Sequence, residues 1–401
     1  MSRVLFFSGS VGLGHVTRDL AIARELRRVA PGVEICWLAA PPATNVIAAA
    51  GETLLPEADA CADVSAVMER VAARGRGVNL VDYLLGARAA WQSNVRAFRS
   101  AIVREQPSVV VGDETYEIAL ALKRRPSLKT FRFVMIYDFI GMSASTRRLR
   151  DRLIVYVMNR RWASDYGTTR DIKDLALFVG EPEDVPDEPF GRGLPNRRAY
   201  ALSKCTFVGY VLPFGADERE ALGNRAALRQ RLGLGDGPLV VCSAGGTAAG
   251  RHLLELCLAA FPAARARLPG LRLLVVAGPR LAAASLPVPE GAEVRGYVPR
   301  LYEQLAACDL AIVEGGGTTT IELTALRRPF LFFPLEGHYE QEVLVAGRLA
   351  RHRAGVRMPR STTSPEALAA QIVGHLGERV ECAEIPCDGA ARAAERIARL
   401  L

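Results

Sequence analysis

Residues 309–341 read DLAIVEGGGTTTIELTALRRPFLFFPLEGHYEQ, and this stretch decides the fold. The apolar run from Leu310 to Val313 predicts a buried strand, and the glycines and threonines after it predict a turn that opens a helix. A second apolar run, from Phe330 to Phe333, predicts another strand. A strand, a helix and a strand in this order are typical of a parallel α/β sheet.

The glycine turn in this stretch predicts a nucleotide site. A glycine turn at a helix N-terminus leaves backbone N–H groups unpaired beside the positive end of the helix dipole, which suits a phosphate. Glu322 follows within that helix and can accept two hydrogen bonds from a ribose diol. The polar loop from Glu336 to Gln341 follows the second strand, at the sheet edge where open α/β folds bind ligands. An ordinary βαβ unit with a glycine-rich turn is the alternative.

The same residues resemble the donor-binding segment of GT-B glycosyltransferases, particularly the UDP-glycosyltransferases and the bacterial peptidoglycan N-acetylglucosaminyltransferases. Plant-type members carry His-Gly-Gly-x-x-Ser-x-x-Glu and later a Pro and an Asp-Gln or Gln-Gln pair, where this chain has EGGGTTTIE over residues 314–322 and EQ at 340–341. The resemblance implies that Glu322 holds the ribose and that Glu340 and Gln341 bind sugar hydroxyls. Glu314 departs from the pattern, because many relatives place a phosphate-facing His there. A carboxylate repels a pyrophosphate unless it points away or pairs with an arginine.

Length and composition fit two α/β domains. The chain has 401 residues, half of them hydrophobic, which suffices for two cores. No apolar run approaches the roughly 20 residues that span a bilayer, and the N-terminus does not read as a signal peptide. The eight cysteines show no C-x-x-C pairing and the five histidines no metal-ligand spacing, so we expect a reduced, cytoplasmic protein with no metal and no resident cofactor. The formal charge of +8 suits an anionic ligand or membrane surface, or reflects only a high arginine content.

Both halves of the chain repeat a Rossmann-like alternation of strands and helices. We therefore predict an α/β protein of GT-B fold, with two Rossmann-like domains facing across a cleft. Residues 1–205 are expected to form an acceptor domain and residues 206–385 a donor domain. The resemblance implies that the helix in residues 386–401 packs back on the N-terminal domain. The stretch from Gly180 to Pro195, rich in proline, glycine and acids, predicts a loop or an approach to the linker.

The first glycine loop, GSVGLGHVT at residues 9–17, follows the predicted strand from Val4 to Phe7. The acid that a dinucleotide site needs after the second strand is absent, so NAD is disfavoured. The G-x-G-H pattern resembles the first loop of the same glycosyltransferases, in which the His is a general base or orients the acceptor hydroxyl. His15 would need a carboxylate to fix its tautomer. Asp113, which ends a predicted strand, is the first candidate and Asp138 the reserve. The alternative is that His15 only caps the helix or bonds a carbonyl.

A second glycine loop, SAGGTAAGR at residues 243–251, follows the first strand of the second half. Related enzymes have a Gly-Gly-Ser-type loop here that approaches the diphosphate, and Arg251 could neutralise its charge. The resemblance also implies that backbone groups near Val298 read the base. A simple tight turn is the alternative for the loop.

Residues 146–161 combine six arginines with apolar residues. This segment, from Arg147 to Arg161, is either a peripheral membrane helix that presents the active site to a lipid acceptor at the inner face of the membrane, or a domain-surface helix whose apolar residues face the core. Aromatic platforms between basic residues, as nucleic-acid binders use, are not evident. The sequence does not indicate an oligomeric state.

We therefore predict an inverting, metal-independent glycosyltransferase that moves a hexose-type sugar from a UDP-sugar or TDP-sugar to an acceptor hydroxyl of a small molecule, lipid or glycan. Inversion is taken from the resemblance alone. A nucleotide-sugar hydrolase or epimerase of the same fold and a non-catalytic nucleotide-sugar-binding protein are the alternatives. The predicted site residues are His15 and Asp113 for catalysis; Gly12, Gly14 and Asp138 for the acceptor loops; and Gly245, Gly246, Thr247, Val298, Gly315, Gly316, Thr318, Thr319, Glu322, Glu340 and Gln341 for the donor.

Overall fold

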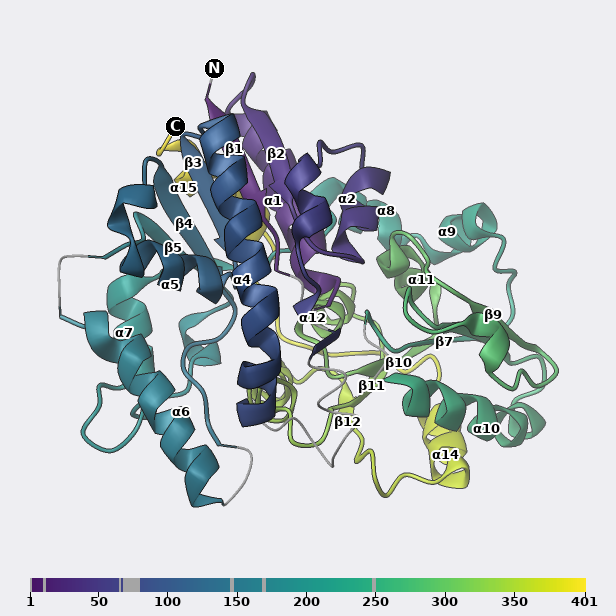
Figure 1. Cartoon of the computed structure of the whole chain (residues 1–401). Helices are drawn as coiled ribbons and strands as arrows, with labels where there is room; N and C mark the ends of the chain where they lie inside the picture. Colours follow the sequence, from purple (N-terminus) through teal and green to yellow (C-terminus); the bar gives the residue numbers. More distant parts are fainter. Residues whose placement is uncertain are drawn as a thin grey trace. The chain divides into compact units, whose positions relative to one another are not determined.

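The chain folds into two compact units (Figure 1). A computed structural model describes residues 2–9, 12–64, 66–67, 80–144, 148–167, 171–246 and 250–401, without the side chains of residues 80–85. Unit 1 comprises Met1–Pro213 and Pro386–Leu401, and unit 2 comprises Phe214–Ile385. Each unit contains one six-stranded parallel sheet flanked by helices, so the predicted pair of Rossmann-like domains is confirmed.

The sheet of unit 1 has the strand order β2-β1-β3-β4-β5-β6. Its strands are β1 (Arg3–Phe7), β2 (Glu34–Leu38), β3 (Val109–Asp113), β4 (Arg132–Tyr137), β5 (Leu175–Val179) and β6 (Thr206–Gly209). Its α-helices are α1 (Gly14–Val29), α2 (Ala43–Ala49), α4 (Leu80–Glu105), α5 (Tyr116–Arg124), α6 (Leu149–Trp162), α7 (Arg197–Lys204) and α15 (Gly389–Ala398). Shorter 3₁₀ turns are η1 (Pro56–Ala60), η2 (Pro126–Leu128), η3 (Ala163–Asp165) and η4 (Pro182–Asp184).

Both faces of this sheet are buried. Along β1, Leu5 and Phe7 join the hydrophobic cluster on one face, while Val4 and Phe6 join the cluster on the other. Side chains of a strand alternate between faces, and a parallel sheet is covered by helices on both, so a continuous apolar strand is expected here.

The first unit extends further than the predicted boundary between residues 205 and 206. β6 completes the first sheet by pairing with β5, with Leu177 opposite Thr206 and Phe178 opposite Phe207. The chain crosses to unit 2 only after Pro213. The stretch from Gly180 to Pro195 lies inside unit 1, held by the burial of Val185 and Phe190. Its first residues bond Gly209 and Tyr210, shortly before the chain crosses to unit 2.

The last helix, α15, belongs to unit 1, which the chain re-enters at Pro386. Ala393, Ala394 and Ile397 are fully buried in the same cluster as Val16 and Ile22 of α1. These apolar positions are spaced three and four residues apart, so one face of the amphipathic helix packs on α1.

The sheet of unit 2 has the strand order β12-β11-β10-β7-β8-β9. Its strands are β7 (Leu239–Ser243), β8 (Arg272–Val276), β9 (Ala292–Arg295), β10 (Leu310–Glu314), β11 (Phe330–Phe333) and β12 (Val356–Arg357). Its helices are α8 (Ala216–Gly223), α9 (Arg225–Leu232), α10 (Arg251–Arg267), α11 (Leu301–Ala307), α12 (Gly317–Ala325), α13 (Ala346–His352) and α14 (Pro365–His375), with a 3₁₀ turn η6 (Ala283–Ser285) and a π-helical turn η7 (Glu340–Val345).

Each sheet has one point at which the direction of winding reverses. In unit 1 it lies between β1 and β3, and in unit 2 between β7 and β10. The loops that leave neighbouring strands there run to opposite faces of the sheet and leave a crevice at the carboxyl ends. The loop after β1 and Asp113 at the end of β3 border the first such point. The glycine loop after β7 and the glycine turn after β10 border the second such point.

The described helices include none that is both long enough and apolar enough to cross a bilayer. Helix α6 is nevertheless unusual, because Leu149, Leu153 and Val157 point outward with side chains 80%, 64% and 40% exposed. Its buried face is narrow and consists of Val155 and Asn159. The interpretation in which the apolar residues of this segment face the core is therefore wrong for the three outward residues.

The packing of α15 on α1 gives a first prediction. We expect Ile397→Ala to lower the free energy of unfolding of unit 1 by about 2–5 kcal/mol, because a fully buried isoleucine is lost and a cavity remains. The three tryptophans, Trp37, Trp91 and Trp162, all lie in unit 1, so urea unfolding followed by tryptophan fluorescence reports this unit alone.

The matched control is Leu202→Ala, which removes a side chain of similar size that is 58% exposed on α7. It should change the unfolding free energy by less than about 0.5 kcal/mol. An equal effect of the two substitutions would show that α15 is not part of the core of unit 1.

Candidate functional site

The first glycine loop places His15 in the opening turn of α1. The helix begins at Gly14, and the structure records no side chain capping it. A Cβ on Gly9 would lie 2.7 Å from the carbonyl oxygen of Asp113, so only glycine lets this loop pass so close to the end of β3. Gly12 has a φ of 78°, which also favours glycine, while Ser10 and Val11 lie outside the described residues.

His15 and Asp113 meet at the predicted place. The Nδ1 atom of His15 lies 3.2 Å from Oδ1 of Asp113, whose side chain is completely buried. Asp138, the reserve candidate, does not contact His15 directly and is instead joined to the site through Arg18. The guanidinium of Arg18 donates from Nη1 to Asp138 Oδ2 (2.7 Å) and from Nε to Asp113 Oδ2 (2.6 Å).

Arg18 is the central residue of this cluster. It lies one helical turn after His15, and its side chain is only 5% exposed. Its Nη2 group pairs with Asp113 Oδ1 and lies 2.8 Å from His15 Nδ1. The three neighbours of the guanidinium come from α1, from β3 and from the residue after β4. We define His15, Arg18, Asp113 and Asp138 as the α1 charge cluster.

The charges of this cluster shift one another's pKa values. Burial, the largest single effect, lowers the pKa of His15, but the charge and hydrogen bond of Asp113 and the charge of Asp138 together outweigh it, so the pKa is raised. Burial alone would raise the pKa of Asp113, but Arg18 and His15 hold it far below its usual range. The pKa of Asp138 is lowered in the same way, chiefly by Arg18 against the effect of burial. Both aspartates are therefore carboxylates at neutral pH.

Two further acids beside the cluster favour their uncharged forms. Asp19 is fully buried and neither of its carboxyl oxygens has a hydrogen-bond partner within the described part of the chain. Burial and the charge of Asp113 raise the pKa of Asp19 well above its usual value. Burial and the charge of Asp138 raise the pKa of Glu114 in the same way.

In unit 2, the predicted glycine turn lies at the N-terminus of α12. Gly316 is the N-cap, no described side chain caps the helix, and Thr320 N–H is the first amide to bond back, to Gly316 O at 3.3 Å. The amides of Gly317, Thr318 and Thr319 therefore point out of the helix beside its positive end. The Thr320 hydroxyl donates to Gly316 O (2.8 Å), so it is not available for a ligand.

Glu314, the residue that departs from the family pattern, pairs with an arginine. Its Oε1 atom lies 3.1 Å from Nη1 of Arg360, and both side chains are largely buried. Burial raises the pKa of Glu314 to about 7, against the opposing effect of Arg360. The charge of Glu314 is thus largely neutralised, which removes the objection to a phosphate near this turn.

Glu322 lies in the middle of α12 and is 6% exposed. Burial raises its pKa to about 8. A ligand that donates hydrogen bonds to this carboxylate would stabilise the charged form and offset that burial. The buried carboxylate of Glu322 therefore suits a ligand with two hydroxyls that donate hydrogen bonds to it.

The predicted sugar-reading pair lies at the start of the π-helical turn η7. Gln341 uses its side-chain oxygen to accept from Leu335 N–H (2.8 Å), so its amide nitrogen is the group left for a ligand. A Cβ on Gly317 would lie 3.7 Å from Glu340 Oε1 and 3.9 Å from Arg348 Nη1. Glu340 and the buried Arg348 thus lie beside the N-terminus of α12. π-Helical turns occur often at functional sites.

The second glycine loop is only partly described, and Thr247 lies outside the described residues. Gly245 has a φ of 70°, and a Cβ on Gly278 would lie 2.5 Å from its carbonyl oxygen. The expected charge-neutralising role of Arg251 does not fit the structure, because its guanidinium bonds Glu255 and Ser285. Arg280 instead reaches the loop, donating to Gly246 O at 3.2 Å.

Val298 follows the edge strand β9, which ends at Arg295. It is half-buried, and the preceding Gly296 accepts a hydrogen bond from Gly278 N–H (3.3 Å). The β9 end is thereby tied to the loop that carries Arg280. Among the described residues, no group of three or more His, Cys, Asp or Glu side chains is arranged to hold a metal ion.

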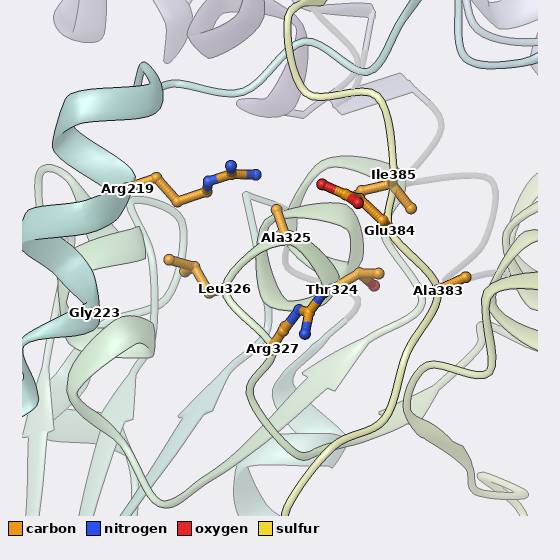
Figure 2. A pocket seen from close by; sticks show the side chains of 9 residues that line it. All are labelled: Arg219, Gly223, Thr324, Ala325, Leu326, Arg327, Ala383, Glu384 and Ile385. Carbon is orange, nitrogen blue, oxygen red and sulfur yellow. The ribbon is translucent and has the colours of Figure 1, made fainter.

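A cavity of about 310 Å³ lies at the opposite end of α12 from the glycine turn (Figure 2). Its lining residues are Arg219, Gly223, Thr324, Ala325, Leu326, Arg327, Ala383, Glu384 and Ile385. Figure 2 shows the side chains of Arg219 and Glu384 pointing toward each other across it. The two arginines are offset by Glu384 and by the negative carbonyl end of α12, and no predicted site residue lines the cavity. We assign it no ligand.

Sequence reasoning missed the arginines at both sites. Arg18 could have been found, because it follows His15 by three residues and must share its helical face. Arg348 and Arg360 are distant in sequence from the residues they approach, and only the tertiary fold brings them there. The same holds for Arg280.

Known proteins share both the sequence pattern and the fold. Residues 240–386 match the glycosyltransferase family 28 C-terminal domain. An uncharacterised glycosyltransferase of Methanopyrus kandleri, MK0977, is 30% identical over 77% of this chain and 91% of its own length. A UDP-N-acetylglucosamine–N-acetylmuramyl-(pentapeptide) pyrophosphoryl-undecaprenol N-acetylglucosamine transferase of Verminephrobacter eiseniae is 26% identical over 92% of this chain and 88% of its own length.

Solved structures agree in fold. The spinosyn rhamnosyltransferase SpnG complexed with thymidine diphosphate superposes with a TM-score of 0.57 at 19% identity, covering 100% of this chain and 96% of its own. A glycotransferase of kitacinnamycin gives a TM-score of 0.59 at 17% identity, over 99% and 94% of the two chains. The predicted GT-B architecture is confirmed, and the chain belongs to the glycosyltransferases that carry the family 28 C-terminal domain.

Proposed function

We propose that this glycosyltransferase transfers a hexose-type sugar from a UDP-sugar to an acceptor hydroxyl, with inversion and without a metal ion. Unit 2 holds the donor and unit 1 supplies the proton acceptor. The observation that carries the proposal is the uncapped N-terminus of α12, which lies beside Arg348 and precedes the buried Glu322 in the same helix.

The donor is assigned from the chemistry of this helix. The free amides of the first turn and the hydroxyls of Thr318 and Thr319 suit the two phosphates, and Glu322 suits the ribose hydroxyls. Gly315 and Gly316 keep the turn free of side chains, and Gly245 and Gly246 do the same for the loop after β7. Glu340, which lies beside this turn, and the amide nitrogen of Gln341 are the groups proposed to bind the sugar. The SpnG complex contains thymidine diphosphate, so TDP is the alternative nucleotide.

The reaction requires that the acceptor hydroxyl lose a proton while the diphosphate leaves. His15 is the proposed general base, since its raised pKa allows it to hold the proton it receives. Asp113 and Asp138 stabilise the imidazolium. The helix dipole and amides of α12 stabilise the charge that develops on the departing diphosphate, which is the role that a metal ion plays elsewhere. Gly12, Gly14 and the loop after Asp138 border the acceptor position.

The acceptor is proposed to be presented at a membrane surface. The outward stripe of Leu149, Leu153 and Val157 on α6 is flanked by exposed arginines, namely Arg148, Arg150, Arg152, Arg160 and Arg161. An apolar stripe bordered by cations suits the interface of an anionic bilayer. The Verminephrobacter eiseniae relative is named for an undecaprenol-linked acceptor, which fits a lipid acceptor here. We propose a cytoplasmic protein that contacts the inner face of the membrane through α6.

Donor binding is tested by thermal shift with UDP, TDP, GDP, ADP and NAD. UDP or TDP at 100 times its dissociation constant should add about 2.7 kcal/mol of stability to the wild type, and Glu322→Gln should lose most of it. Because the pKa of Glu322 is about 8 and the ligand prefers its carboxylate, the affinity of the wild type should rise between pH 6.5 and pH 8.5. Glu342→Gln in the π-helical turn η7 is the control. Stabilisation by NAD, or equal stabilisation of Glu322→Gln, would contradict the donor site.

The role of His15 is tested by UDP release from UDP-N-acetylglucosamine in the presence of a bacterial lipid extract. His15→Gln should lower turnover by about 10²–10⁴-fold with unchanged UDP binding, because only the proton acceptor is lost. Wild-type activity should fall as the pH drops through the raised pKa of His15, since the imidazolium cannot accept a proton. His252→Gln, at an exposed histidine of unit 2, should retain activity. Full release of free sugar without acceptor would instead identify a hydrolase.

Membrane contact is tested by co-sedimentation with vesicles. Wild type should bind vesicles that contain phosphatidylglycerol more strongly than vesicles of phosphatidylcholine alone, and Leu149→Ser/Leu153→Ser should bind several-fold less. The control pair is Val103→Ser/Leu202→Ser, which removes residues 74% and 58% exposed on other helices. An equal loss in both pairs would show that α6 has no special role.

A further inference from the structure

The contacts of Arg18 determine where His15 can carry its hydrogen. Both oxygens of Asp113 are occupied by Arg18, Oδ2 by Nε at 2.6 Å and Oδ1 by Nη2. Nη1 is directed to Asp138 at 2.7 Å. One N–H of Nη2 is used by Asp113, and the other faces His15 Nδ1 at 2.8 Å. All three nitrogens of the guanidinium are thus engaged inside the α1 charge cluster.

His15 Nδ1 has two neighbours, one of which is a hydrogen-bond acceptor and the other a donor. Asp113 Oδ1, at 3.2 Å, can only accept, and so requires a hydrogen on Nδ1. Arg18 Nη2, at 2.8 Å, can only donate, and so requires a bare lone pair on Nδ1. The shorter contact is the one to Arg18, and Oδ1 already receives an arginine hydrogen. Neutral His15 in this geometry therefore carries its hydrogen on Nε2.

This tautomer matters for the proposed general base. With its hydrogen on Nε2, His15 presents an N–H donor to the ligand and has no lone pair there to accept a proton. The base form needs the hydrogen on Nδ1, donated to Asp113, and Nε2 bare. The exchange takes two balanced steps: Nδ1 gains a proton from water to give the imidazolium, and Nε2 then returns its proton to water.

The net charge of the cluster makes that exchange accessible. Arg18 carries one positive charge and the two aspartates carry two negative charges, so the cluster holds one negative charge while His15 is neutral. A proton on His15 brings the cluster to neutrality. The raised pKa of His15 agrees with this. The cluster therefore stabilises the imidazolium through which the two tautomers exchange. The position of Arg18 determines whether this imidazolium loses its proton from Nδ1 or from Nε2.

We propose that Arg18 is a positioning residue that holds free His15 in the Nε2–H tautomer, so that His15 becomes a base only when Arg18 Nη2 releases Nδ1 to Asp113. The inference rests on the proposed role of His15 as proton acceptor. It concerns a state of the free protein, however, and can be tested without any turnover.

The test is the tautomer of His15 by ¹⁵N NMR of the full-length protein at a pH above the His15 titration. The chain has five histidines, and the spectrum of His15→Gln assigns the signals of the one that is lost. In wild type we expect the proton on Nε2. In Arg18→Lys we expect it on Nδ1, because a single ammonium keeps the positive charge but has only three hydrogens on one nitrogen, where the guanidinium makes four contacts from three nitrogens. Asp138→Asn leaves the Arg18–Asp113–His15 contacts in place and should keep the wild-type tautomer.

A proton on Nδ1 in the wild type would overturn the inference, even if Arg18→Lys does not fold. The same tautomer in wild type and Arg18→Lys would overturn it as well. Failure of the proposed function has a different signature, because His15→Gln would then turn over normally while the tautomers remained as expected. A purely structural role of Arg18 predicts lower stability in Arg18→Lys with no change of tautomer.

Discussion

The parallel pairing of β1 with β3 and of β7 with β10 is the constraint on which both candidate sites depend. Parallel strands end at a common edge, and helices that leave neighbouring strands toward opposite faces open a crevice there. In unit 1 this brings the N-terminus of α1 to Asp113, and in unit 2 it sets the glycine loop after β7 beside the turn after β10. A helix N-terminus therefore lies at each of the two points, one carrying a histidine and the other a turn of glycines.

The two helix ends differ in how their surroundings treat charge. Around α1, a buried guanidinium is matched by the buried carboxylate of Asp113 and the partly buried carboxylate of Asp138. Removing one partner of a buried ion pair leaves an uncompensated charge that costs about 3–5 kcal/mol. Around α12, the carboxylic acids are buried with less compensation, and the pKa values of Glu314 and Glu322 rise to about 7 and about 8. The charges around α1 are balanced by other residues of the protein. The carboxyl groups around α12 lack such partners in part, and a ligand that donates hydrogen bonds would supply them.

Much of this could be predicted from the sequence, because it depends on local pattern. The apolar runs gave the strands to within one or two residues in most places, and the glycine turns marked the helix N-termini. Asp113 was found because it ends a strand. The features that were missed depend on contacts between distant segments: the pairing of β6 with β5, the ion pair of Glu314 with Arg360, and the approach of Arg348 to Gly317. The outward face of α6 could not be predicted either, since its apolar residues are equally compatible with a core.

The most direct test of the central claim, that the N-terminus of α12 holds the diphosphate of the donor, is hydrogen–deuterium exchange with and without UDP. The amides of Gly317, Thr318 and Thr319 precede the first bonded amide of the helix, so they should exchange fast in the free protein. Saturating UDP should slow the exchange of peptides that cover residues 315–320, with little change in α14 or α9. UDP binding that leaves these peptides unprotected, and protects another segment instead, would contradict the assignment of the donor site.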